Sequence, residues 1–100
     1  MSLGAKRFLL ECISGRDKQA NVFVDEHPVR LAHKALLPGL AIAEMDIADG
    51  YLLVQIEEDE FIVDASNCVM PIYINDHEIV REALGQDDVL RIGDSIWRVR

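Results

Sequence analysis

The sequence predicts an all-β protein, an antiparallel β-sandwich with at most one or two short helical turns. Apolar and polar residues alternate in several short segments, which is the period of a half-buried strand. Roughly six or seven such segments follow one another at regular spacing, with turn-forming residues between them. The chain has 100 residues, 50% of them hydrophobic. Residues 1–100 are therefore expected to form a single domain around one modest core.

The first strand is expected over residues 6–13. Within it, Phe8, Leu10 and Cys12 occupy alternate positions, so they are expected to share the buried face. The sequence Ser-Gly-Arg-Asp over residues 14–17 is typical of a turn.

A second strand is expected over residues 21–25, ended by Pro28. Residues 29–37 fit no strand pattern cleanly and are expected to form one or two helical turns, because Pro38 and Gly39 follow as stop signals.

The middle of the chain predicts an acidic hairpin. Residues 51–56 and 61–63 are apolar runs, and the four carboxylates of residues 57–60 lie between them. A calcium loop usually spaces its ligands at alternate positions around a glycine bend. Since consecutive acids in a strand point to opposite faces, a solvated turn is the expected structure here.

The last third predicts a short strand over residues 72–74 and a terminal hairpin. In that hairpin, residues 89–92 and 96–99 flank Gly93, which supplies the unusual turn dihedral. Residues 76–84 are expected to form a short helix with Asp76 as its N-cap and Gly85 after its end.

The net charge of −8 is unevenly distributed along the chain. Residues 1–39 carry six bases and four acids, residues 40–88 carry one base and thirteen acids, and residues 89–100 carry three bases and one acid. Phosphate groups attract clustered cations, so neither nucleic acid nor an anionic membrane is an expected partner. The alternative interpretation is that the acids serve only to keep a small domain soluble. No apolar run approaches the roughly 20 residues of a membrane-spanning helix, so direct membrane insertion is not expected.

No motif for catalysis, metal or cofactor binding stands out. The three histidines, His27, His33 and His77, have no metal-ligand spacing among themselves or with the cysteines. Cys12 and Cys68 are expected to be buried free thiols, with a disulfide or thiol chemistry as alternatives. No glycine-rich phosphate loop or nucleophile motif occurs. The chain is therefore expected to be no enzyme and to need no cofactor.

The C-terminal third contains a series of short motifs in a fixed order: Asp64-Ala65-Ser66, Ile72-Tyr73-Ile74-Asn75, Leu84-x-x-Asp87-Asp88-Val89-Leu90-Arg91-Ile92-Gly93 and Ile96-Trp97-Arg98-Val99. In their order and spacing, these motifs resemble the closing half of a forkhead-associated (FHA) domain. The opening Arg7-Phe8-Leu9-Leu10-Glu11, followed by Gly15, is similar to the family's first strand and turn. The resemblance implies a two-sheet sandwich of FHA/SMAD type whose apical loops bind phosphothreonine peptides.

The phosphate-binding motifs of that family are not matched here. The family uses a Gly-Arg after its second strand, a Ser-Arg-x-His segment and an Asn-Gly pair before the "tyr-val-Asn" strand. In this sequence the Gly-Arg pair, Gly15-Arg16, comes too early. Residues 37–42 stand where the Ser-Arg-x-His segment is expected, and the alternative placement, Arg30-Leu31-Ala32-His33, has the wrong spacing. Met70-Pro71 stands where the Asn-Gly pair is expected. If phosphopeptide binding survives, the resemblance and the chain's polar residues favour Arg30, Ser66, Asn67 and Asn75 as contributors.

The expected function is that of a non-catalytic protein–protein interaction or assembly module with a degenerate FHA-like fold. The alternative is a working phosphothreonine-binding FHA domain. The chain is also similar in style to the cytoplasmic domain of the inner-membrane ring protein of type III secretion systems. That resemblance implies a cytoplasmic location and protein partners, including copies of the chain itself.

Overall fold

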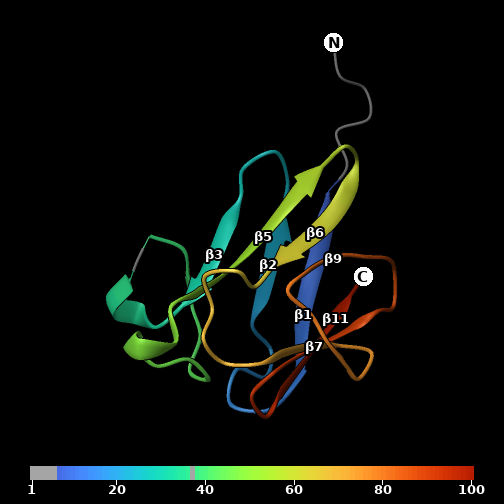
Figure 1. Cartoon of the computed structure of the whole chain (residues 1–100). Coiled ribbons are helices and arrows are strands. Elements are labelled where there is room, and N and C mark those ends of the chain that lie inside the picture. The colour runs from blue at the N-terminus through green and yellow to red at the C-terminus, as the bar shows by residue number, and fades with distance from the viewer. Residues whose placement is uncertain (1–6, 37) are drawn as a thin grey trace.

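The computed structural model describes residues 7–36 and 38–100, which form two β-sheets packed face to face (Figure 1). The predicted all-β sandwich is confirmed, and the only helical elements among the described residues are two 3-10 turns, η1 (Lys34–Leu36) and η2 (Ile47–Asp49). No helix in the described part of the chain is long and apolar enough to span a membrane.

The first sheet has six strands in the spatial order β2-β1-β11-β10-β7-β8. Their bounds are β1 Phe8–Ser14, β2 Asn21–Val24, β7 Ile72–Ile74, β8 His77–Glu78, β10 Val89–Ile92 and β11 Ser95–Val99. All pairs in this sheet are antiparallel.

The second sheet has five strands in the order β4-β3-β5-β6-β9. Their bounds are β3 Val29–Ala32, β4 Leu40–Ala41, β5 Tyr51–Glu57, β6 Glu60–Asp64 and β9 Arg81–Leu84. The short strand β4 pairs in parallel with β3, which is the one departure from the predicted antiparallel pattern among the described strands.

Alternate residues of both sheets fill the core between them. In β10 and β11 the inward residues Leu90, Ile92, Trp97 and Val99 are 0% exposed. Trp97 is the largest of these side chains, and its indole N–H has no hydrogen-bond partner among the described residues. Because a buried aromatic ring removes a large apolar area from water, burial of Trp97 contributes strongly to the stability of the fold.

The helical prediction for residues 29–37 is wrong in its first half. Residues 29–32 form β3, which pairs with β5 and buries Leu31 completely. Only Lys34–Leu36 makes a helical turn, and residue 37 lies outside the described residues. A surface helix could not bury Leu31 between the sheets, so tertiary pairing overrides the local stop signals.

The helix predicted over residues 76–84 is also wrong. Asn75 and Asp76 have φ values of 47° and 69°, and the chain reverses there into β8 and then β9. Two consecutive left-handed residues form a tight hairpin turn, whereas an N-cap residue needs an extended backbone. Leu84 is buried at the end of a strand, so Gly85 does not end a helix.

The other predicted elements are found close to their expected bounds. The first strand begins at Phe8, since Arg7 is described and lies before the strand, while residue 6 is outside the described residues. The acidic hairpin has a two-residue turn at Glu58 and Asp59, with φ values of 52° and 67°. Both cysteines are free thiols; Cys12 is buried as predicted, whereas Cys68 is only half-buried.

Candidate functional site

Three loops gather at one end of the sandwich, and we call them the apex. They are the β3–β4 loop (residues 33–39), the β4–β5 loop (residues 42–50) and the β6–β7 loop (residues 65–71). Backbone hydrogen bonds join the last two loops, since Val69 N–H donates to the Asp49 carbonyl at 2.9 Å and Tyr51 N–H donates to the Asn67 carbonyl at 3.1 Å. The apex lies at the opposite end of β5 from the acidic hairpin turn (Figure 1).

Gly50 makes the close approach of these two loops possible. Its φ is 78°, and a Cβ atom at this position would lie 2.1 Å from the Asn67 carbonyl oxygen. Any side chain would therefore both strain the backbone and push the β4–β5 and β6–β7 loops apart.

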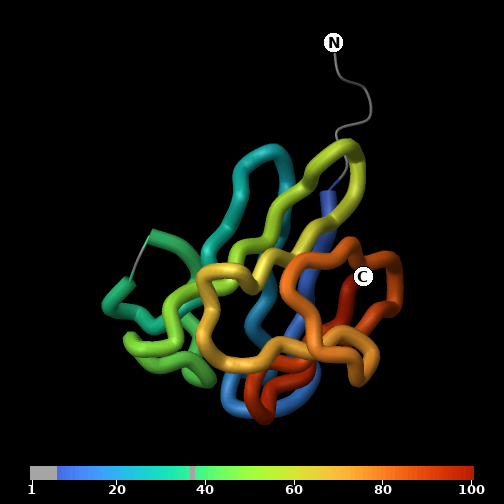
Figure 2. The backbone as a smooth tube through the Cα atoms, in the orientation of Figure 1, coloured from blue at the N-terminus to red at the C-terminus, as the bar shows by residue number. Residues whose placement is uncertain are grey.

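Two carboxylates bind backbone N–H groups at the apex. Asp17, in the β1–β2 turn, accepts hydrogen bonds from the N–H groups of Ala43 at 2.7 Å and Glu44 at 3.4 Å. Glu44 in turn accepts from the Asp94 N–H at 3.1 Å and the Ser95 hydroxyl at 3.0 Å. These contacts hold the β1–β2 and β10–β11 turns beside the apex, and Figure 2 shows these two turns side by side.

Hydrogen bonding shifts the titration of two carboxyls in this region. Burial raises the pKa of Glu44, but the hydrogen bonds from Asp94 and Ser95, together with Arg16, outweigh it, so the pKa lies below its ordinary value. The Ser66 hydroxyl and N–H lower the pKa of Asp64, with a smaller contribution from Arg81. Both groups are thus held as anions by donors of the chain itself.

The three loops carry few cations. Among their described residues Lys34 is the one Lys or Arg, against the carboxylates of Glu44, Asp46 and Asp49. Two apolar side chains are instead exposed: Ile47 at 57% and Val69 at 79%. The surface is therefore acidic and partly apolar, where a phosphate-binding loop would present cations.

Three of the four predicted site residues gather around the start of β5. The Arg30 guanidinium lies 4.6 Å from the centre of the Tyr51 ring, and Asn67 accepts from the Tyr51 backbone. Ser66 precedes Asn67, but its hydroxyl and N–H both donate to the Asp64 carboxylate. Arg30 and Asn67 thus keep exposed polar groups, whereas the Ser66 donors are occupied.

The fourth predicted residue, Asn75, lies away from the apex. It follows the far end of β7, where its side chain donates to Asp88 at 3.0 Å and accepts from the Val89 N–H at 3.0 Å. These bonds join the β7–β8 turn to the start of β10. In this structure Asn75 therefore braces the fold.

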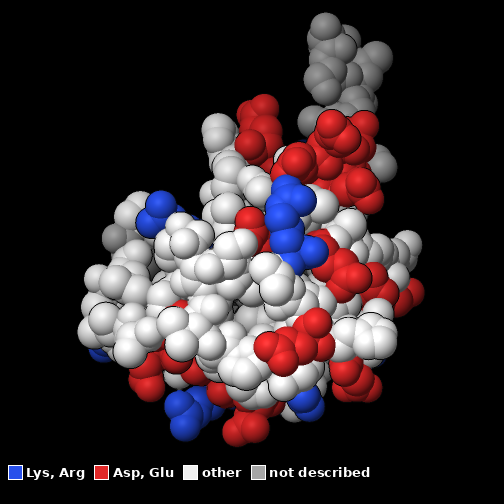
Figure 3. All heavy atoms as spheres, viewed as in Figure 1, with Lys and Arg blue, Asp and Glu red and all other residues white. Residues whose placement is uncertain are grey.

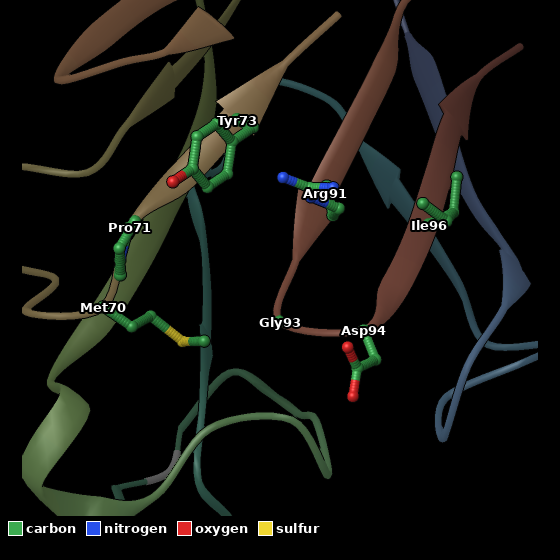
Figure 4. Close-up of a pocket in the computed structure, with 7 residues that line it drawn as sticks. All are labelled: Met70, Pro71, Tyr73, Arg91, Gly93, Asp94 and Ile96. Atoms are coloured by element: carbon green, nitrogen blue, oxygen red, sulfur yellow. The ribbon is translucent and has the colours of Figure 1, made fainter. Parts of the chain in front are cut away.

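A pocket of about 520 Å³ lies beside the apex on the outer side of the first sheet (Figure 4). Met70 and Pro71 form one wall, and Arg91 lies 4.6 Å from the centre of the Tyr73 ring. Met70 and Pro71 occupy the place where the FHA resemblance expects Asn-Gly. Since proline has no N–H and methionine no amide side chain, this wall offers no side-chain donor to a peptide backbone.

Neither a metal-ligand cluster nor an activated thiol is found among the described residues. No group of three or more His, Cys, Asp or Glu side chains among them could hold a metal ion. Burial raises the pKa of the Cys12 and Cys68 thiols, which disfavours the nucleophilic thiolate.

Sequence reasoning missed Asp17, Glu44, Ile47 and Val69. Asp17 is 26 residues from Ala43, and Glu44 is 50 residues from Asp94. No local pattern marks contacts of that separation, and the acidity of residues 40–88 pointed only to Glu44.

Neither a scan against protein-family models nor a search of curated proteins returns a match to this sequence. Solved structures do match. The FHA domain of an Arabidopsis thaliana hypothetical protein superposes with a TM-score of 0.78 at 14% identity, covering 96% of this chain and 86% of that one. An FHA domain studied for phosphothreonine-dependent interactions gives 0.73 at 16% identity, covering 95% and 96%.

A third match is the FhaA FHA domain complexed with the intracellular domain of Rv3910, with a TM-score of 0.72 at 13% identity, covering 93% of this chain and 99% of that one. At these identities the matches establish the fold. The FHA-like fold predicted from the C-terminal motifs is confirmed, while the similarity to the secretion-ring protein stays a prediction.

Proposed function

We propose that the chain is a non-catalytic protein–protein interaction module whose FHA-like apex does not recognise phosphothreonine. The observation that carries this proposal is the occupation of apical backbone donors by the chain's own carboxylates. Asp17 binds the apical N–H groups of Ala43 and Glu44, and Glu44 binds the N–H of Asp94 in the β10–β11 turn beside the apex. A phosphate would have to displace these carboxylates before it could use the same donors.

Electrostatics supports the same proposal. A phosphothreonine carries a charge of about −1.5 to −2 and needs Arg or Lys partners. The three apical loops offer Lys34 against three carboxylates among their described residues. Exposed Ile47 and Val69 favour apolar contacts with a protein partner instead.

The two solved relatives with named interactions support a binding role. One was studied for phosphothreonine-dependent interactions and one is complexed with an intracellular domain of another protein. We carry over only the general role of binding a protein. An assembly role like that of the secretion-ring protein, and a cytoplasmic location, fall within this proposal, and two free thiols suit a reducing compartment.

Phosphothreonine recognition is the second candidate function, and Arg30 is the observation that favours it. Its side chain is exposed, lies over the ring of Tyr51, and has no ion pair among the described residues. Against it, the Ser66 donors are occupied and Asn75 lies away from the apex.

Titration with a library of phosphothreonine peptides and their unphosphorylated counterparts separates the two functions. The proposal predicts no saturable difference between phosphorylated and plain peptides up to about 1 mM. Saturable binding that needs the phosphate, is lost in Arg30→Ala and is kept in Arg98→Ala would overturn it. Arg98 is a suitable control because it is an arginine on β11, in the other sheet.

A further inference from the structure

The two sheets end in four edge strands: β2 and β8 in the first sheet, and β4 and β9 in the second. An edge strand exposes unpaired N–H and C=O groups that can pair with another chain. Proteins usually protect such edges by keeping them short or by placing charges on them.

Three of the four edges have such protection. Strands β4 and β8 contain two residues each. Strand β9 begins with Arg81 and Glu82, which are both exposed, and Arg81 forms an ion pair with Glu57. Pairing with another strand at these edges is therefore disfavoured by length or by charge.

Strand β2 lacks this protection. Its four residues, Asn21–Val24, carry no charge. Val22 and Val24 point into the core, at 7% and 0% exposure, whereas Phe23 on the outer side is 66% exposed. Phe23 lies opposite Leu9 of β1 in the register, so the outer side of this edge is apolar. Uncharged strands with β-branched and aromatic residues have the highest tendency to pair.

The charges that flank β2 favour an antiparallel copy of the same strand as the partner. Exposed Lys18 precedes the strand, and exposed Asp25 and Glu26 follow it. Antiparallel pairing of β2 with β2 of a second copy would place the Lys18 end of each strand beside the Asp25–Glu26 end of the other. A parallel arrangement would instead bring like charges together at both ends, which costs energy.

We propose that two copies of this chain associate through antiparallel pairing of their β2 strands. The pairing is two-fold symmetric and joins the two six-stranded sheets edge to edge, with the two Phe23 side chains on the same outer face. This surface is separate from the apex, so the proposal stands or falls independently of phosphothreonine binding. A pairing of four residues buries much less than the roughly 1,200 Å² of a standard interface, so the association is weak.

Sedimentation velocity on the full chain, from about 10 µM to about 1 mM, tests this proposal. The natural chain should show concentration-dependent dimers, and Phe23→Lys should remain monomeric because it places two like charges in the pair. Val80→Lys is the matched control: Val80 is 70% exposed, lies in the bend between β8 and β9, and makes the same charge change. It should dimerise as the natural chain does.

Two further measurements keep the proposal falsifiable. Phe23→Thr retains strand propensity and removes the aromatic contact, so it should weaken the dimer at least about fivefold without unfolding the chain. Amide chemical shifts that change with concentration should cluster at residues 21–24. Natural chain that stays monomeric at about 1 mM, dimers unaffected by Phe23→Lys, or shift changes that map elsewhere would each overturn the proposal. A monomer whose β2 amides shift only when a foreign extended peptide is added would also overturn it.

Discussion

Carboxylates have opposite roles at the two ends of the sandwich. At the apical end, Asp17 and Glu44 accept hydrogen bonds from backbone N–H groups of other loops. At the other end, Glu57, Glu58, Asp59 and Glu60 are exposed around a tight turn. Of these four carboxylates, only Glu57 forms an ion pair within the described residues, and its partner is Arg81. Figure 3 shows acidic side chains gathered where β5 and β6 turn.

The difference teaches how a net charge of −8 should be understood. Carboxylates that accept hydrogen bonds from the chain stabilise its loops and fill places that an external anion could take. Carboxylates of a solvated turn add solubility and negative potential but little stability. The formal charge is the same, and only the surrounding donors distinguish the two groups.

The largest effect is expected where the apical loops meet. Gly50→Ala should lower the free energy of unfolding by about 3 kcal/mol, because its Cβ would clash with the Asn67 carbonyl at a backbone conformation that favours glycine. Urea unfolding followed by the fluorescence of Trp97, the single tryptophan, measures this. The matched change at the acidic turn, Asp59→Gly, should be neutral or slightly stabilising because its φ is 67°.

Removal of the Asp17 carboxylate should be the next most damaging change. Asp17→Ala leaves the N–H groups of Ala43 and Glu44 without their acceptor, which should cost about 2 kcal/mol. Asp17→Asn keeps one acceptor oxygen and should recover part of this loss. Equal losses in Asp17→Ala and Glu58→Ala would show that the two groups of carboxylates do not differ.

Glu44→Gln should cost about 1 kcal/mol near neutral pH and change the pH dependence of stability. Because the folded pKa of Glu44 is depressed, its stabilisation is present above the unfolded value and is lost as pH falls through the folded value. Unfolding measured from pH 6 to pH 3 should therefore show a shallower loss in Glu44→Gln than in the natural chain. Glu58→Gln is the control for the loss of one exposed carboxylate. A Glu44→Gln profile parallel to the natural one would contradict the assignment.

The smallest effect is expected at the acidic turn itself. Glu58→Gln combined with Asp59→Asn should change the free energy of unfolding by less than about 0.5 kcal/mol, since both side chains are exposed. Thermal unfolding at low and high salt measures it. A loss comparable to that of Asp17→Ala would show that the turn has a structural role.

The same division explains what could be predicted from the sequence. The hairpin around Gly93 was predictable because alternation and a turn residue specify it locally. The helix predicted over residues 76–84 is wrong because Asn75 and Asp76 form a left-handed turn. The sequence of such a turn looks the same as that of a helix N-cap, since Asp and Asn are favoured in both. The apical site was not predictable, since Asp17 and Glu44 find their donors 26 to 50 residues away along the chain.

The predicted site residues show the same limit. Arg30 and Asn67 both contact Tyr51, Arg30 through the ring and Asn67 through the backbone N–H, and no local pattern in the sequence marks that shared neighbour. Nothing local distinguishes Ser66, whose donors bind Asp64, from a serine free to bind a ligand. Hydrogen-bond occupancy is a tertiary property, and it decides whether a polar residue can act on a ligand.

The central claim is that the chain's own carboxylates occupy the apical donors, and an NMR pH titration of the backbone amides tests it most directly. The amide signal of Asp94 should move as the Glu44 carboxyl is protonated, with a midpoint below the ordinary value of 4.5. Asp17→Asn should shift the amide signals of Ala43 and Glu44, because their N–H groups donate to that carboxylate. An Asp94 amide that does not titrate, or that titrates at 4.5 or above, would contradict the account.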